Sequence, residues 1–211
     1  MGFFGRKKEQ QNTAADELKI SFEGQTPAVS ADFGVDYNDI LRGLEVIDAN
    51  EDKTRIWGGL AVLTVCAVIA IPRIFGFSKI FGVIFVLLLL YIIGAQVLGP
   101  AINRKNTAQK TVKENKAGTV HLFPGGYQVV IHGVPYNVPF RVVTCYETDT
   151  CYVFVLGKVQ MMVFNKSIFG EKNPLVKEIL VANMGLGRRY FKVDEKGKVI
   201  KGQGQNPADQ R

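Results

Sequence analysis

The feature that most constrains this chain is a long central stretch that is almost free of charge. Between Ile56 and Ile102 the charged residues are Arg73 and Lys79 alone. The part after Lys79 runs for more than 20 residues without a charge, which at 1.5 Å per residue is enough for a helix to cross a hydrocarbon core of about 30 Å. This part predicts a transmembrane helix.

The first part of the stretch is shorter. It has about 16 uncharged residues before Pro72, so it reaches spanning length if the Arg73 side chain extends to the far interface. We therefore expect a transmembrane hairpin at residues 55–102, with spans at about 55–74 and 80–101. A buried hairpin of a soluble protein is the alternative, but a chain of 211 residues offers little partner surface to cover it.

Positive residues near the two spans predict the orientation of the hairpin. They are more numerous at its outer ends than in its connecting loop, which favours a cytoplasmic location for both termini. The positive residues at the outer ends are Lys53, Arg55, Arg104, Lys105, Lys110, Lys113 and Lys116.

Charge is distributed unevenly along the chain. Residues 1–55 carry seven Lys and Arg against eleven Asp and Glu, whereas residues 102–211 carry seventeen against eight. The two flanks would attract each other on one side of a membrane, and the basic flank favours anionic lipids. Because the sequence has no groove-reading helix or aromatic RNA-binding motif, we expect no nucleic-acid partner.

The segment before the hairpin predicts a small amount of ordered structure. Residues 1–17 are expected to be a disordered N-terminus, followed at 18–54 by a strand, Leu18 to Glu23, and a helix, Asp36 to Ala49. The helix has an apolar stripe at helical spacing, with Asp36 as its N-cap. We expect this stripe to pack on the C-terminal domain.

After the hairpin, residues 103–117 form a basic connector and the periodicity then changes to that of strands. The strands precede a helix at about Pro174 to Asn183, which Gly185 ends, and residues 194–211 form a hairpin and a disordered tail. Pro135 and Pro139 predict that the third strand lies at a sheet edge or is a loop instead. The predicted strands are Thr119–Phe123, Tyr127–His132, Tyr136–Phe140, Arg141–Glu147, Cys151–Leu156 and Val159–Phe164.

These elements predict an α+β domain at residues 118–193. Short antiparallel strands followed by one helix are typical of a pleckstrin-homology-like (PH-like) β-barrel or roll capped by its C-terminal helix, here completed by the N-terminal strand and helix. The order of parts, together with the sequence VQMMVFNKSIF at 159–169, resembles the YcxB-like family of bacterial membrane proteins over residues 18–193. Asn165 stands where that family often has proline. The resemblance implies a PH-like fold and a location in the bacterial inner membrane, and it implies no activity.

No residue pattern in the sequence indicates catalysis. The G-x-S-x-G, P-loop and H-E-x-x-H motifs are missing, so we expect no enzyme, cofactor or metal. The two histidines, His121 and His132, do not have metal-ligand spacing with Cys145 and Cys151. Those two cysteines are expected to be reduced and to face each other across the turn that separates their strands.

The leading hypothesis is a membrane-anchored PH-like module that binds anionic lipid or an unidentified protein at the cytoplasmic face. The alternative is a small subunit of an oligomeric transport or channel assembly, joined through Ala95, Gln96 and Gly99, and a homodimer also stays open. Positive residues near the spans also set topology, which is the simpler explanation of the first four candidates. The lipid- or partner-binding candidates are Arg104, Lys105, Lys110, Lys113, Lys166, Arg188 and Arg189.

Overall fold

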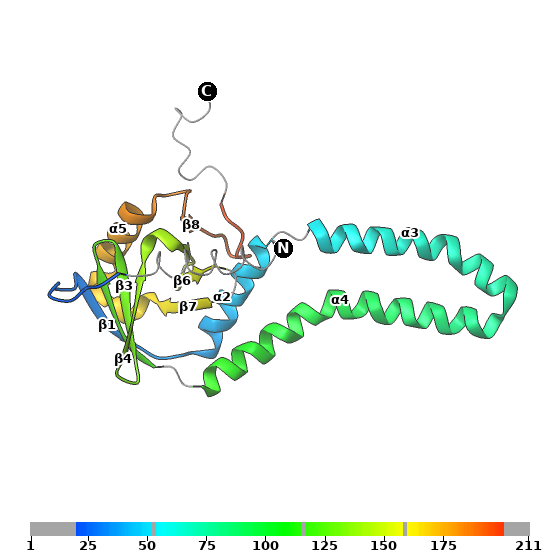
Figure 1. Ribbon diagram of the computed structural model, residues 1–211, viewed down its shortest axis with the longest axis horizontal. Coiled ribbons are helices and arrows are strands. Elements are labelled where there is room, and N and C mark those ends of the chain that lie inside the picture. The colour runs from blue at the N-terminus through cyan, green and yellow to red at the C-terminus, as the bar shows by residue number, and fades with distance from the viewer. Residues whose placement is uncertain (1–19, 52–53, 115–116, 158–159, 201–211) are drawn as a thin grey trace, which may run out of the picture. The chain divides into compact units, whose positions relative to one another are not determined.

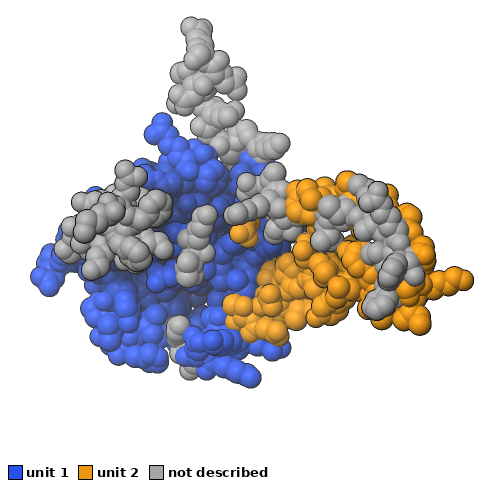
Figure 2. All heavy atoms as spheres, turned by 45° about the vertical axis from the view of Figure 1, so that its right-hand side comes forward, with its two compact units in different colours: residues 1–50, 108–211 blue, residues 51–107 orange. Residues whose placement is uncertain are grey.

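The computed structural model describes residues 20–51, 54–114, 117–157 and 160–200. The chain divides into two compact units, coloured separately in Figure 2. The first, called here the α+β unit, comprises the described residues of 1–50 and 108–211, and the second, the helical unit, comprises those of 51–107. The predicted disordered segment 1–17 and the tail from residue 201 lie outside the described residues.

The α+β unit contains two sheets in its described part (Figure 1). The first sheet is antiparallel, with the strand order β1-β2-β3-β4, and the second has the order β7-β6-β5-β8. In the second sheet β8 runs parallel to β5, while the other pairs are antiparallel. The strands are β1 Val29–Phe33, β2 Gly118–Phe123, β3 Gly126–Ile131, β4 Val134–Pro139, β5 Val143–Glu147, β6 Cys151–Leu156, β7 Gln160–Asn165 and β8 Tyr190–Lys192.

The structure confirms the α+β class. It also confirms that the third predicted strand, β4, lies at a sheet edge. The 3₁₀ turn η1, Phe140–Val142, separates β4 from β5, and these two strands belong to different sheets.

The position of the first strand was also predicted wrongly. The described residues of the predicted strand, Ile20 to Glu23, are not part of a sheet, and β1 at Val29–Phe33 pairs with β2 instead. Val29 and Phe33 are buried and Ala31 is half-buried, whereas Ser30 and Asp32 are exposed. The segment therefore has the period of two that is typical of a half-buried strand. Phe22 contributes differently, by stacking on the Phe123 ring at 4.3 Å.

Two helices belong wholly to the α+β unit. Helix α2, Tyr37–Asn50, begins after Asp36, whose Oδ1 accepts hydrogen bonds from the backbone N–H of Asn38 (2.8 Å) and Asp39 (3.3 Å); this confirms the predicted N-cap. Helix α5, Asn173–Met184, follows the 3₁₀ segment η2, Lys166–Lys172, and ends at Gly185, whose φ of 72° confirms it as the stop.

The second sheet is covered on both faces. On one face it packs against the first sheet and α5, around rings such as Tyr127, Phe154 and Phe164. On the other face Val153 and Val163 pack against Ile40 of α2. The predicted apolar stripe of α2 therefore has the partner that was expected, the strands of the C-terminal domain.

The helical unit is formed by α3, Thr54–Phe77, and most of α4, Lys79–Lys113. The unit boundary falls within α4, between Thr107 and Ala108. Among the described residues no single helix is long and apolar enough to cross a membrane. Two consecutive parts of α4, Gly82–Gln96 and Leu98–Lys113, meet the criteria of length and composition together, with a bend of 44° between them. Pro100 explains the bend, because it removes the N–H that would bond to the carbonyl of Gln96.

Candidate functional site

The most developed polar cluster in the α+β unit surrounds the carboxylate of Glu147. This residue ends β5 and is only 8% exposed. Its Oε1 lies 3.0 Å from Nζ of Lys166 and 3.1 Å from Nζ of Lys177, and its Oε2 accepts a hydrogen bond from the Tyr190 hydroxyl at 2.7 Å. One buried carboxylate therefore joins β5, η2, α5 and β8.

The electrostatics of the cluster keep Glu147 ionised. Burial by itself would raise the pKa of its carboxyl group, but the hydrogen bonds from Tyr190, Lys166 and Lys177 outweigh burial and the pKa is lowered. The pKa of Tyr190 is raised, first by burial and then by its hydrogen bond to the carboxylate. Tyr190 is thus a neutral donor, and the cluster holds one negative and two positive charges.

Lys166 has little capacity left for an external ligand. Its side chain is 18% exposed, and besides Glu147 its ammonium group donates to the Thr148 carbonyl at 2.5 Å and lies 5.2 Å from the centre of the Tyr152 ring. The Tyr152 hydroxyl in turn donates to Oδ1 of Asn173 at 2.9 Å. The structure places this candidate binding residue inside the fold, where it connects η2 to β5.

Sequence analysis missed the Glu147 cluster, although one signal was present. Val143, Cys145 and Glu147 alternate along one strand, and the first two are apolar positions of the core. That alternation puts the Glu147 carboxylate on the buried face, where a charge needs a partner. The tertiary structure decides which lysines become the partners, because Lys166 and Lys177 lie 19 and 30 residues away in sequence.

The remaining predicted candidates are separate from this cluster. Arg188 and Arg189 lie in the turn between α5 and β8, where Arg188 is exposed and Arg189 donates to the Phe140 carbonyl at 3.4 Å. The Gly185 to Gly187 segment that precedes them contains the helix stop that was predicted at Gly185.

Four further candidates lie on α4: Arg104 and Lys105 in the helical unit, and Lys110 and Lys113 in the α+β unit. Lys105, Lys110 and Lys113 are exposed, Arg104 is half-buried, and Ala108 is completely buried in the core beneath α2. The final turns of α4 therefore direct a small residue inward and lysines outward. Such a helix face can contact an anionic surface without losing its packing on the sheet.

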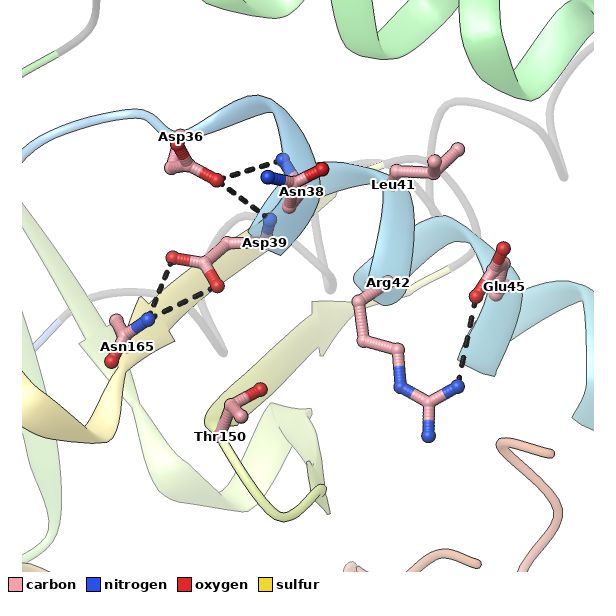
Figure 3. Close-up of a pocket in the computed structure, with 8 residues that line it drawn as sticks. All are labelled: Asp36, Asn38, Asp39, Leu41, Arg42, Glu45, Thr150 and Asn165. Atoms are coloured by element: carbon pink, nitrogen blue, oxygen red, sulfur yellow. Dashed lines mark hydrogen bonds and ion pairs between the residues drawn. The ribbon is translucent and has the colours of Figure 1, made fainter. Parts of the chain in front are cut away.

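An open pocket of about 470 Å³ lies beside the start of α2 (Figure 3). Asp36 is used there as the N-cap, Asp39 accepts from Nδ2 of Asn165 at 3.0 and 3.1 Å, and Arg42 lies 3.6 Å from Glu45. Each charged side chain that lines the pocket thus already has a partner within the chain. The pocket is best explained as the polar junction between α2 and the end of β7.

Asn165 is the second residue whose role sequence analysis missed. Its Nδ2 binds Asp39 of α2, while its Oδ1 accepts from the backbone N–H of Ser167 at 3.0 Å and caps η2. Asn165 thus adds a direct bond between α2 and the end of β7.

The structure corrects the predicted relation of the two cysteines. The β5–β6 register places Cys145 opposite Phe154, and the two thiols belong to the cores on opposite faces of the sheet. Burial raises the pKa of both Cys145 and Cys151. They are unreactive, buried apolar groups and cannot pair with each other.

Metal binding finds no support within the part of the chain that the structure describes, where no group of three or more His, Cys, Asp and Glu residues could hold an ion. Nδ1 of His121 is hydrogen-bonded to Oγ of Ser30 at 2.8 Å. His121 pairs with Gln128 in the β2–β3 register, so it does not face His132.

Comparison of the chain with protein-family models, with curated proteins and with solved structures gave no match. Both oxygens of Glu147 already accept hydrogen bonds, and such a carboxylate is a poor general base. The cluster therefore ties β5, η2, α5 and β8 together.

Proposed function

We propose that this chain is a membrane-anchored binding module. In this proposal α3 and α4 cross a bacterial inner membrane as a hairpin, and both termini and the α+β unit lie at the cytoplasmic face. The α+β unit is a PH-like domain that binds anionic lipid or a protein partner and catalyses no reaction.

The observation that carries the proposal is the exposure of large apolar side chains along α3 and α4. Ile80 is 73% exposed, Leu87 60% and Tyr91 75%. Apolar surface that stays in contact with water costs about 25 cal/mol per Å², so helices of this composition need an apolar environment. The bend at Pro100 is compatible with a membrane, because membrane helices tolerate proline kinks.

The path of the chain supports a hairpin over a single span. Strand β1 comes before the two long helices and β2 comes after them, yet β1 and β2 pair over five residues of register, from Val29 opposite Leu122 to Phe33 opposite Gly118. Both flanks of the helices must therefore be on the same side of any membrane that they cross. Since positive residues are more numerous beside the flanks, that side is the cytoplasm.

The order of strands supports a PH-like domain. Four antiparallel strands, β1 to β4, are followed by three, β5 to β7, and then by α5, which packs on the core through Val176 and Leu180. In this proposal the strands form a barrel or roll whose end is closed by α5. The exposed lysines of α4, among them Lys110 and Lys113, suit an anionic partner.

Thiol labelling from one side of the membrane tests this proposal. The three native cysteines are replaced, and Ser78→Cys (between α3 and α4) or Asp149→Cys (in the β5–β6 turn) is introduced into the full chain. A membrane-impermeant maleimide applied to spheroplasts is expected to label the Ser78→Cys variant, and the Asp149→Cys variant only after permeabilisation. Labelling of both variants from outside, or recovery of the chain without detergent, would contradict the proposal.

A further inference from the structure

Two residues of β4 expose large apolar side chains on the strand face that builds the core. Val134 is 50% exposed and Tyr136 54%, whereas Val138, two residues further on, packs against the core. Because side chains alternate along a strand, all three lie on the same face. The face that the core covers at Val138 is therefore uncovered at the beginning of β4.

Addition of a partner strand does not account for this exposure. The hydrogen bond from Phe140 N–H to the Gly125 carbonyl (2.9 Å) fixes the phase of the β3–β4 ladder, so the N–H positions of Pro135, Asn137 and Pro139 point to the free edge. Proline has no N–H, which leaves Asn137 as the one outward donor among these three. An edge of this kind is blocked against β-augmentation.

The exposed pair lies at the end of the sheet where the chain arrives from α4. Val134 is opposite Ile131, and Ile131 is opposite Gly118, the first residue of β2. Four residues separate Gly118 from Lys113, the last residue of α4, and this connection spans at most about 17 Å. Lys110 and Lys113 are exposed and have no ion pair within the described residues.

We propose that the β3–β4 turn, with Val134 and Tyr136, inserts into the headgroup region of an anionic membrane, and that Lys110 and Lys113 contact the lipid phosphates beside it. This inference rests on the proposed membrane anchoring. Tyrosine prefers the interface because its ring is apolar and its hydroxyl is polar. Apolar side chains flanked by lysines form the combination that interfacial segments use on anionic bilayers.

Tryptophan quenching in liposomes tests the insertion. The full chain is reconstituted into vesicles of phosphatidylcholine and phosphatidylglycerol, with a fraction of the lipids brominated near the glycerol end of the acyl chains. The reporter is Tyr136→Trp combined with Trp57→Phe. The matched control is Leu175→Trp with Trp57→Phe, because Leu175 is also exposed, at 42%, but lies on α5, which contacts η1 beyond the other end of β4.

We expect the emission of the Tyr136→Trp reporter to shift to shorter wavelength and to be quenched, while the Leu175→Trp control keeps its emission. Replacing Lys110 and Lys113 with glutamine should reduce the quenching in anionic vesicles. Equal emission from reporter and control would overturn the insertion, and quenching unaffected by the two lysine substitutions would overturn the lysine contact.

The native Trp57 separates failure of this inference from failure of the anchoring. It lies on α3 and is 64% exposed. If Trp57 in the unsubstituted chain is quenched but the Tyr136→Trp reporter is not, the proposed insertion of the β3–β4 turn is refuted while the proposed membrane anchoring is supported. Absence of quenching in both chains overturns both proposals.

Discussion

Removing the charge of Glu147 should destabilise the α+β unit strongly. Glu147→Gln keeps the size of the side chain but leaves the ammonium group of Lys166, only 18% exposed, without its counter-charge. Breaking one partner of a buried ion pair costs about 3–5 kcal/mol. Lys177 is 41% exposed and can turn to water, so its ion pair with Glu147 contributes little to stability. We therefore expect Glu147→Gln to lower the free energy of unfolding by about 3 kcal/mol.

A double-mutant cycle isolates the interaction from other effects of the substitution. Lys166→Met removes the cation and keeps much of the apolar stem, so the double variant has no unpaired buried charge. We expect the loss in the free energy of unfolding of the double variant to be about 2 kcal/mol smaller than the sum of the two single losses. If the two single losses simply add within about 0.5 kcal/mol, the buried pair has no coupling energy and the reasoning is refuted.

The assay uses the buried thiols of the α+β unit. Cys145 and Cys151 are both buried, so a short pulse of maleimide at increasing urea labels them only when the unit opens. Every variant carries Cys66→Ala, which leaves these two as the remaining cysteines. The labelled fraction in mild detergent gives the free energy of unfolding by linear extrapolation.

The same variants give a pH dependence with a defined sign. Because the folded pKa of Glu147 is lowered from 4.5, its contribution to stability is fully present above that unfolded value and is lost as the pH falls through the folded pKa. The difference between the parent and Glu147→Gln should therefore be constant near neutral pH and shrink in acid. A difference that grows as the pH falls would show that the carboxylate is not stabilised by its lysines.

Three further predictions use the described packing and the same urea assay, or gel analysis. Gly197→Ala should lower the free energy of unfolding more than Gly24→Ala does. Both glycines have φ near 75°, but a Cβ added at Gly197 lies 3.2 Å from a backbone atom of α2, whereas one added at Gly24 meets nothing. Equal losses, of about 1–2 kcal/mol each from the backbone conformation alone, would contradict this prediction. Gly43→Ala should destabilise by about 1–3 kcal/mol despite the better helix propensity of alanine, since its methyl group would lie 2.6 Å from a valine of β7; a gain in stability would show that α2 does not pack there. Oxidation of native membranes with a copper catalyst should form no bond between Cys145 and Cys151, and an intramolecular disulfide in the peptide map would refute the β5–β6 register.

Much of the secondary structure of the α+β unit follows from local pattern. The helix after Asp36 begins at its predicted cap, the helix before Gly185 ends at its predicted stop, and β6 has the predicted bounds. In each case the signal is short-range, namely a capping side chain, a residue that tolerates positive φ, or a strand bounded by turns. Such signals do not depend on the rest of the chain.

The errors come from pairing, which is a long-range property. β1 was placed too early because Leu18 to Glu23 alternates as well as Val29 to Phe33 does, and the partner strand β2 decides between them. The parallel pairing of β8 with β5, and the register that separates the two cysteines, also depend on neighbours distant in sequence. The Glu147 cluster belongs to the same class, because four elements converge on one residue.

The most direct test of the whole account combines cleavage and crosslinking in one gel. Asp32 and Thr119 are opposite each other in β1 and β2, with their side chains 2.7 Å apart, so Asp32→Cys and Thr119→Cys can be joined by oxidation. A protease site is inserted after Ser78, and protease is added to intact spheroplasts. The account predicts complete cleavage from outside, with the two halves still joined until reductant is added; an uncut chain, or halves that separate without reductant, would contradict it.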